Sequence, residues 1–191
     1  MLSLRNVCAF TVVVCAFAVP AIAQTNTYRV LATTRTSTMQ DEMRQAGDEG
    51  FRFVAAMGGE TAIGGREVVV LMEKVAGSTA RYQHLVLATN RTSTLQKEIQ
   101  EASDEGYQVV GQTVFQSTFG GKETAALLER SIDAADIVRY EYKMAATSRT
   151  STMQKELQEL ADQGFEAVGM TVGKTAIGGA ELVVITRRRV Q

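Results

Sequence analysis

The sequence predicts an α+β protein of three tandem β-α-β-β units, each a mainly antiparallel sheet covered by one short helix. One polar hexapeptide, RTSTMQ or RTSTLQ, occurs three times, at 35–40, 91–96 and 149–154. Around it, three segments align without a gap: repeat unit 1 at 28–74, repeat unit 2 at 84–130 and repeat unit 3 at 142–188. A repeat of this length indicates one supersecondary unit per copy, and the three units are expected to pack into one body.

Each unit is expected to open with a strand, because alternating, β-rich segments precede the hexapeptide: YRVLATT, HLVLATN and YKMAATS. The hexapeptide itself predicts a helix start. Ser37 followed by Gln40 matches a capping box, in which the hydroxyl accepts from free amides of the first turn and the glutamine reaches back. The same pattern recurs as Ser93 with Gln96 and as Ser151 with Gln154.

Apolar residues then follow at i, i+4 and i+7, which is one face of a helix. They are Met39, Met43 and Ala46, then Leu95, Ile99 and Ala102, then Met153, Leu157 and Leu160. Gly50, Gly106 and Gly164 come where a left-handed C-terminal cap favours a residue without Cβ. The pattern therefore predicts a short helix with a defined beginning and end.

A β-hairpin is expected after each helix, with a glycine pair at its turn: Gly64-Gly65, Gly120-Gly121 and Gly178-Gly179. Its second strand is continuously apolar at 68–72, 125–128 and 182–185, which predicts a central strand covered on both faces. The resulting strand order is 1-3-2. Because a unit of this size is marginal alone, we expect the units to pack through their open faces or edge to edge.

The helix ends read EGF at 49–51 and EGY at 105–107, and one closing strand reads LLER at 127–130. With these motifs each unit resembles a bacterial domain-of-unknown-function family of short β-α-β-β modules, whose helix ends in Glu-Gly-aromatic. The aromatic position is held by Phe51, Tyr107 and Phe165. The resemblance implies a fold, and it implies no catalytic residue.

Residues 1–23 have the pattern of a signal peptide. Arg5 supplies the positive charge, Val7 to Val19 is almost entirely apolar, and Ala21-Ile22-Ala23 forms a cleavage site before Gln24. We therefore expect an exported protein, periplasmic or secreted, with no transmembrane span after signal cleavage.

Several function classes are disfavoured by composition. Cys8 and Cys15 both lie in the predicted signal, so the mature chain would be cysteine-free. His84 is the single histidine and aligns with Tyr28 and Tyr142, which argues against histidine-based nucleophilic or metal sites. The balance of 20 basic and 21 acidic side chains argues against nucleic-acid binding. We expect no cofactor, no metal and no catalytic residue, with a carboxylate-based glycan hydrolase as the enzymatic alternative.

The residues repeated in all three copies are the candidate ligand-binding residues. They are Arg35, Thr36, Ser37, Thr38, Arg91, Thr92, Ser93, Thr94, Arg149, Thr150, Ser151 and Thr152. On one interpretation the arginines pair with carboxylates of a neighbouring unit and fix the packing. On the other, each helix start recognises an anionic small molecule or an envelope glycan. The sequence thus predicts a non-catalytic binding or assembly protein, with self-association as a further possibility.

Overall fold

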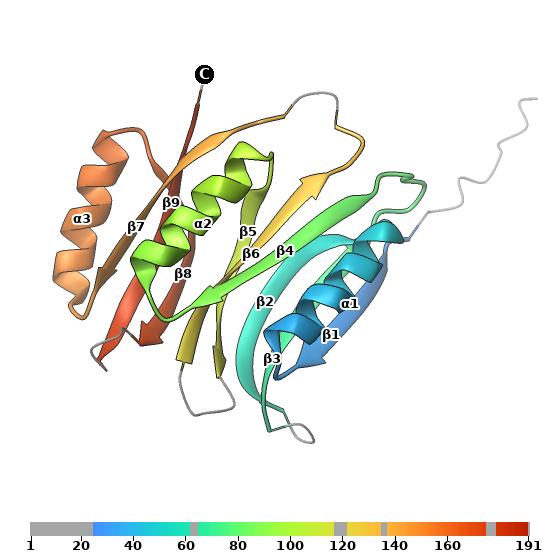
Figure 1. Ribbon diagram of the computed structural model, residues 1–191, viewed down its shortest axis with the longest axis horizontal. Coiled ribbons are helices and arrows are strands. Elements are labelled where there is room, and N and C mark those ends of the chain that lie inside the picture. The colour runs from blue at the N-terminus through green and yellow to red at the C-terminus, as the bar shows by residue number, and fades with distance from the viewer. Residues whose placement is uncertain (1–24, 62–64, 117–121, 135–136, 175–178, 191) are drawn as a thin grey trace, which may run out of the picture.

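The computed structural model describes residues 25–61, 65–116, 122–134, 137–174 and 179–190. It confirms an α+β fold of three β-α-β-β units (Figure 1). The predicted signal peptide lies outside the described residues, and so do the glycine pairs of the hairpin turns apart from Gly65 and Gly179.

Unit 1 consists of β1 (Thr27–Thr33), α1 (Thr36–Asp48), β2 (Arg52–Thr61) and β3 (Gly65–Lys74). Unit 2 consists of β4 (Tyr82–Thr89), α2 (Thr92–Asp104), β5 (Gln108–Gln116) and β6 (Lys122–Ser131). Unit 3 consists of β7 (Tyr140–Thr147), α3 (Thr150–Asp162), β8 (Glu166–Lys174) and β9 (Ala180–Arg189). The sheets have the orders β1-β3-β2, β4-β6-β5 and β7-β9-β8, antiparallel throughout, so the predicted order 1-3-2 is confirmed.

The predicted capping boxes are wrong. The N-cap residues are Arg35, Arg91 and Arg149, and no side chain caps any of the three helices. The Thr33 hydroxyl accepts a hydrogen bond from the Arg35 amide at 3.2 Å and turns the chain there, so helical geometry begins at Thr36. Ser37 consequently lies inside the first turn, beyond the position from which a hydroxyl caps.

The predicted C-terminal caps are confirmed. Gly50, Gly106 and Gly164 have φ angles of 93°, 93° and 84°, a conformation that favours glycine. The predicted apolar face is confirmed in α1 and α2, whose three apolar residues are all buried. In α3 only Met153 is buried, whereas Leu157 and Leu160 are half-buried.

The units stack face to face along the long axis of the molecule (Figure 1). Met39 and Met43 of α1 pack against Val70 of their own sheet and against Leu127 of the following sheet. The helix α2 makes the equivalent contacts with the sheets of units 2 and 3. Each of these two helices therefore lies between its own sheet and the next one, while β2, β5 and β8 pack on one another.

This stacking explains how the central strands are covered. Residues 125–128 of β6 are all buried, as predicted for a strand covered on both faces. In β9, residues 183–185 of the predicted range 182–185 are buried, and Leu182 is half-buried. In β3 only Val68, Val70 and Met72 are buried, while Val69 and Leu71 are half-buried. The prediction of cover on both faces is wrong for β3, because none of the described residues packs on the outer face of its sheet.

Candidate functional site

The three copies of the hexapeptide begin the three helices at one edge of the molecule (Figure 1). Arg35, Arg91 and Arg149 are exposed, as are Ser37, Ser93, Thr94, Thr150 and Ser151, and the remaining threonines are half-buried. Within the described residues, none of the three guanidinium groups pairs with a carboxylate. The predicted ion pairs to a neighbouring unit are therefore not formed, and the arginines project into solvent.

A groove of about 340 Å³ lies next to the first helix start. Thr34, which directly precedes Arg35, lines it together with Arg66 of unit 1 and Lys122 of unit 2. Thr171 of unit 3 completes the wall, so all three units contribute. Glu67 also lines this groove, which leaves it mixed in charge rather than uniformly cationic.

The last residue of the hexapeptide binds the next unit. The side-chain amide of Gln40 donates to the carbonyl oxygen of His84 at 2.8 Å, and its own oxygen accepts from the amide of Val86 at 2.6 Å. Gln96 accepts from the amide of Met144 at 3.0 Å in the same way. These glutamines therefore join a helix to the first strand of the following unit instead of completing a capping box.

Further along the helix, a small residue allows close approach to the same strand. A Cβ at Gly47 would lie 2.3 Å from the carbonyl oxygen of Tyr82. The residue in the same position of α2, Ser103, donates its hydroxyl to the Tyr140 carbonyl at 3.0 Å and accepts from the Tyr140 amide at 3.1 Å. A larger side chain at either position would separate the helix from the strand.

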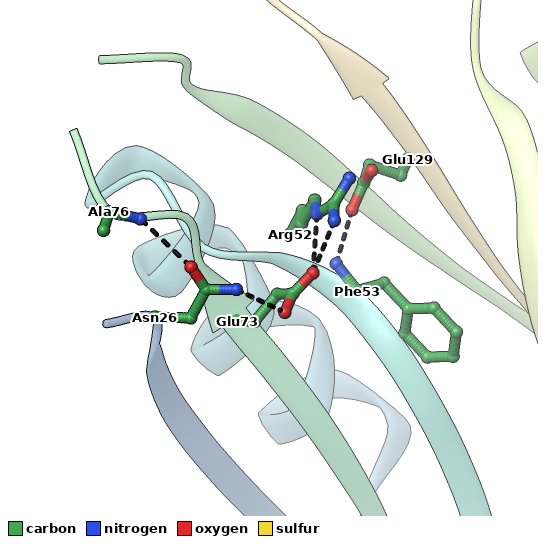
Figure 2. A network of polar contacts seen from close by, with 6 residues as sticks. All are labelled: Asn26, Arg52, Phe53, Glu73, Ala76 and Glu129. Atoms are coloured by element: carbon green, nitrogen blue, oxygen red, sulfur yellow. Dashed lines mark hydrogen bonds and ion pairs between the residues drawn. The ribbon is translucent and has the colours of Figure 1, made fainter. Parts of the chain in front are cut away.

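A second inter-unit contact forms where β2 bulges between Phe53 and Ala55. The Phe53 amide donates to the Glu129 carboxylate at 2.6 Å, which Figure 2 shows as a contact between two units. The same carboxylate oxygen lies 2.8 Å from Nε2 of His84, which is buried. His84 and Glu129 are register partners in β4 and β6, so the predicted strand order was the signal that could have paired them.

The equivalent contact between units 2 and 3 uses one side chain. The Val109 amide, at a bulge in β5, donates to the hydroxyl of Tyr142 at 3.0 Å. Burial raises the pKa of the Tyr142 hydroxyl, because the charged form would lose its hydration. Tyr142 occupies the position of His84, and its hydroxyl accepts from the Val109 amide as the Glu129 carboxylate accepts from the equivalent amide of Phe53.

Unit 1 also carries a polar network within itself (Figure 2). Arg52 binds Glu73 with its Nε at 3.0 Å, and this hydrogen bond raises the pKa of the guanidinium. Asn26 donates to Glu73 at 3.3 Å and accepts from the amide of Ala76 at 3.2 Å. On the opposite side of the unit, the hydrogen bond from Arg29 lowers the pKa of Glu49. These pairs hold the ends of strands together.

Two of the partly buried carboxylates, Glu129 and Glu73, are thus bound by structural partners. Glu129, which also lines a groove of about 470 Å³, is bound by His84 and the Phe53 amide, and Glu73 is bound by Arg52. Across the described ranges, no group of three or more His, Cys, Asp and Glu residues could hold a metal ion.

No family model, curated protein or solved structure matches the chain. Among the described helices, none is long and apolar enough to cross a membrane.

Proposed function

We propose that the chain is an exported, non-catalytic assembly protein, in which the stacked units present an end surface to a protein partner. The observation that carries this proposal concerns the last residue of the hexapeptide, the glutamine that joins a helix to the next unit, in its third copy. Gln40 and Gln96 are bound by the following unit, whereas Gln154, at the same position of α3, is exposed and is bound by none of the described residues. A docking residue that is present and unoccupied supports a role in assembly.

The polar side chains that are candidates for catalysis support the same proposal. The Glu129 carboxylate binds His84 and the Phe53 amide, so its charge is used in joining units 1 and 2. This arrangement favours a structural role for the carboxylate over a role in glycan hydrolysis. Export rests on the signal pattern of residues 1–23, and membership in the family of short β-α-β-β modules stays a prediction.

The assembly role is tested in cells that export the chain, with a photo-crosslinking amino acid at position 154. The matched control is the same amino acid at Glu159, which lies on the same helix and is exposed on another side. We expect a protein adduct from position 154 and none from position 159, with the partner identified by mass spectrometry. Equal labelling from both positions, or none from either, would rule out the proposal. Sequencing of the mature amino terminus, expected at Gln24, tests export in the same preparation.

Anion recognition at the helix starts is the second candidate function. It is favoured by the absence of side-chain caps at all three described helices, which leaves first-turn amides available, and by Arg66 and Lys122 in the adjacent groove. Calorimetry with phosphate, sulfate and sugar acids tests it. Saturable binding that is lost when Arg35, Arg91 and Arg149 are all changed to alanine, in a chain that stays folded, would establish it. No heat of binding to any of these anions would exclude it.

A further inference from the structure

The first strand of the chain exposes a surface that the later units bury. Tyr28 and Val30 of β1 are 59% and 65% exposed. At the position of Tyr28, His84 of β4 and Tyr142 of β7 are only 3% and 2% exposed, and at the position of Val30, Val86 and Met144 are half-buried. The difference arises because α1 covers β4 and α2 covers β7, whereas none of the described helices covers the corresponding face of β1.

The last helix carries the groups that would cover such a strand. Gln154, Gln158 and Ala161 of α3 stand at the positions of Gln96, Gln100 and Ser103 of α2. All three α2 residues bind the backbone of β7, and all three α3 residues are exposed. Gln158 even has the same contact within its helix, to Asp162 at 3.0 Å, that Gln100 makes to Asp104 at 3.2 Å. The docking face of α3 is therefore complete and unused.

The two ends also match in their apolar surface. Of ten exposed large hydrophobic residues among those described, six lie on the two end faces of the stack: Tyr28, Val30, Val54, Met57, Met170 and Val172. The last two are register partners of Val184 and Leu182, which pack with α3, so they lie on the same side of their sheet as α3. Apolar surface gathered at two faces, rather than scattered, is typical of an interface.

A polar contact can be matched as well. The strand β8 bulges between Ala167 and Gly169, at the positions where β5 bulges between Val109 and Gly111. The Val109 amide donates to Tyr142, and Tyr28 holds the position of Tyr142 in unit 1. The Tyr28 hydroxyl of another molecule would therefore meet the Ala167 amide.

We propose that a second copy of this chain binds α3 and β8 through its own β1, head to tail, and so continues the stack between molecules. The inference rests on the proposed assembly function and names its partner. Gln154 would bind the backbone of Tyr28 and Val30 in the second copy, as Gln40 binds that of His84 and Val86 within the chain. Because the two surfaces differ and lie at opposite ends of the long axis, the contact generates a ring or an open filament (Figure 1).

One residue makes this contact weaker than the internal ones. The strands of units 2 and 3 have Gly111 and Gly169 where the preceding unit packs, and a Cβ there would lie 2.5 Å from Phe53 and 2.9 Å from Gln112. Unit 1 has Ala55 at this position. In the proposed contact, the Cβ of Ala55 would hold the β8 strand of the other molecule further away. Association is therefore expected to depend on concentration, and Ala55→Gly is expected to strengthen it.

The test is sedimentation velocity of the purified chain over a wide concentration range. We expect reversible association that Val30→Glu weakens about tenfold or more, because a charge would be buried without a partner, and that Ala55→Gly tightens. Ile132→Glu, at an exposed apolar residue of the linker between units 2 and 3, is the matched control and should change nothing. A chain that stays monomeric at every concentration would overturn the inference.

Disulfide formation between two single-cysteine variants gives a second readout that does not depend on affinity alone. Mixed Gln154→Cys and Val30→Cys chains should form a heterodimer on oxidation, whereas Gln154→Cys mixed with Ile132→Cys should not. If the purified chain stays monomeric and uncrosslinked while position 154 still labels a different protein in cells, the assembly function holds and the partner is not a second copy. If position 154 labels nothing in cells, the assembly function itself fails.

Discussion

The backbone amide of Phe53 in β2 donates a hydrogen bond to the carboxylate of Glu129 in β6, at 2.6 Å and across the boundary between units 1 and 2. This amide lies beside the bulge between Phe53 and Ala55 in β2, an edge strand of its sheet. A partly buried amide costs free energy unless it is bound. The boundary between units 2 and 3 meets the same need with the hydroxyl of Tyr142.

Replacing Glu129 by alanine is expected to lower the free energy of unfolding by about 2–3 kcal/mol, because two donors, the Phe53 amide and His84, lose a charged acceptor. Glu129→Gln keeps an acceptor oxygen and should cost less. Urea denaturation of both variants measures the difference. Equal losses of free energy of unfolding in the two variants would show that Glu129 stabilises the fold through its charge rather than through an acceptor oxygen that glutamine retains.

Gln40, Gln96 and Gln154 hold the same position in the three helices, so the stabilities of their alanine variants can be compared directly. Gln40→Ala and Gln96→Ala are each expected to destabilise the chain by about 1–3 kcal/mol, since inter-unit hydrogen bonds are lost and a strand amide is left without its acceptor. Gln154→Ala should be neutral in dilute solution, because Gln154 is exposed and none of the described strands binds it. The free energies of unfolding of the three variants check this ordering, and an equal effect at position 154 would contradict the docking role.

Tyr142→Phe is expected to cost about 1–2 kcal/mol, because the Val109 amide loses its acceptor. The variant should also change the alkaline pH dependence. Burial raises the pKa of Tyr142 above its ordinary value of 10.0, so the folded protein holds this proton more tightly than the unfolded chain. Titration of this group should therefore leave the wild-type free energy of unfolding independent of pH below pH 10 and lower it above pH 10. Tyr28→Phe, at an exposed tyrosine, is the control and should keep the wild-type slope.

Acid stability should depend on the pair of Arg29 and Glu49. The hydrogen bond from Arg29 lowers the pKa of Glu49 below its ordinary value of 4.5, so the pair stabilises the fold at higher pH. That contribution is lost as the pH falls below 4.5 through the folded pKa. Melting temperatures of the wild type and of Glu49→Gln should differ at pH 6 and converge at pH 3. A difference that persists at pH 3 would assign the effect to packing rather than to charge.

Much of the fold could be predicted because its signals are local. The spacing of Met39, Met43 and Ala46 determines a helix face, and Gly50 ends the helix through a backbone conformation that other residues rarely adopt. The strand order could be predicted because a continuously apolar strand needs neighbours on both sides.

The roles of the hexapeptide could not be predicted in the same way. Any of the four consecutive residues Arg35 to Thr38 could stand at the N-cap of α1. The hydrogen bond from the Arg35 amide to the Thr33 hydroxyl places Arg35 there. The partner of Gln40 depends on which strand the stacking brings beside α1, a contact 44 residues away in sequence. Such a contact leaves no periodic signal in a single unit.

Each internal boundary joins the helix face of one unit to the opening strand of the next, and the amide of Phe53 or Val109 would suit either His84 with Glu129 or Tyr142. This contact does not depend on how many units the chain contains. A gene that lost or gained a copy of unit 2 or unit 3, which have glycine at the position of Ala55, would still encode a chain whose internal boundaries use these contacts, so the length of the protein can change by whole modules without redesign of a core.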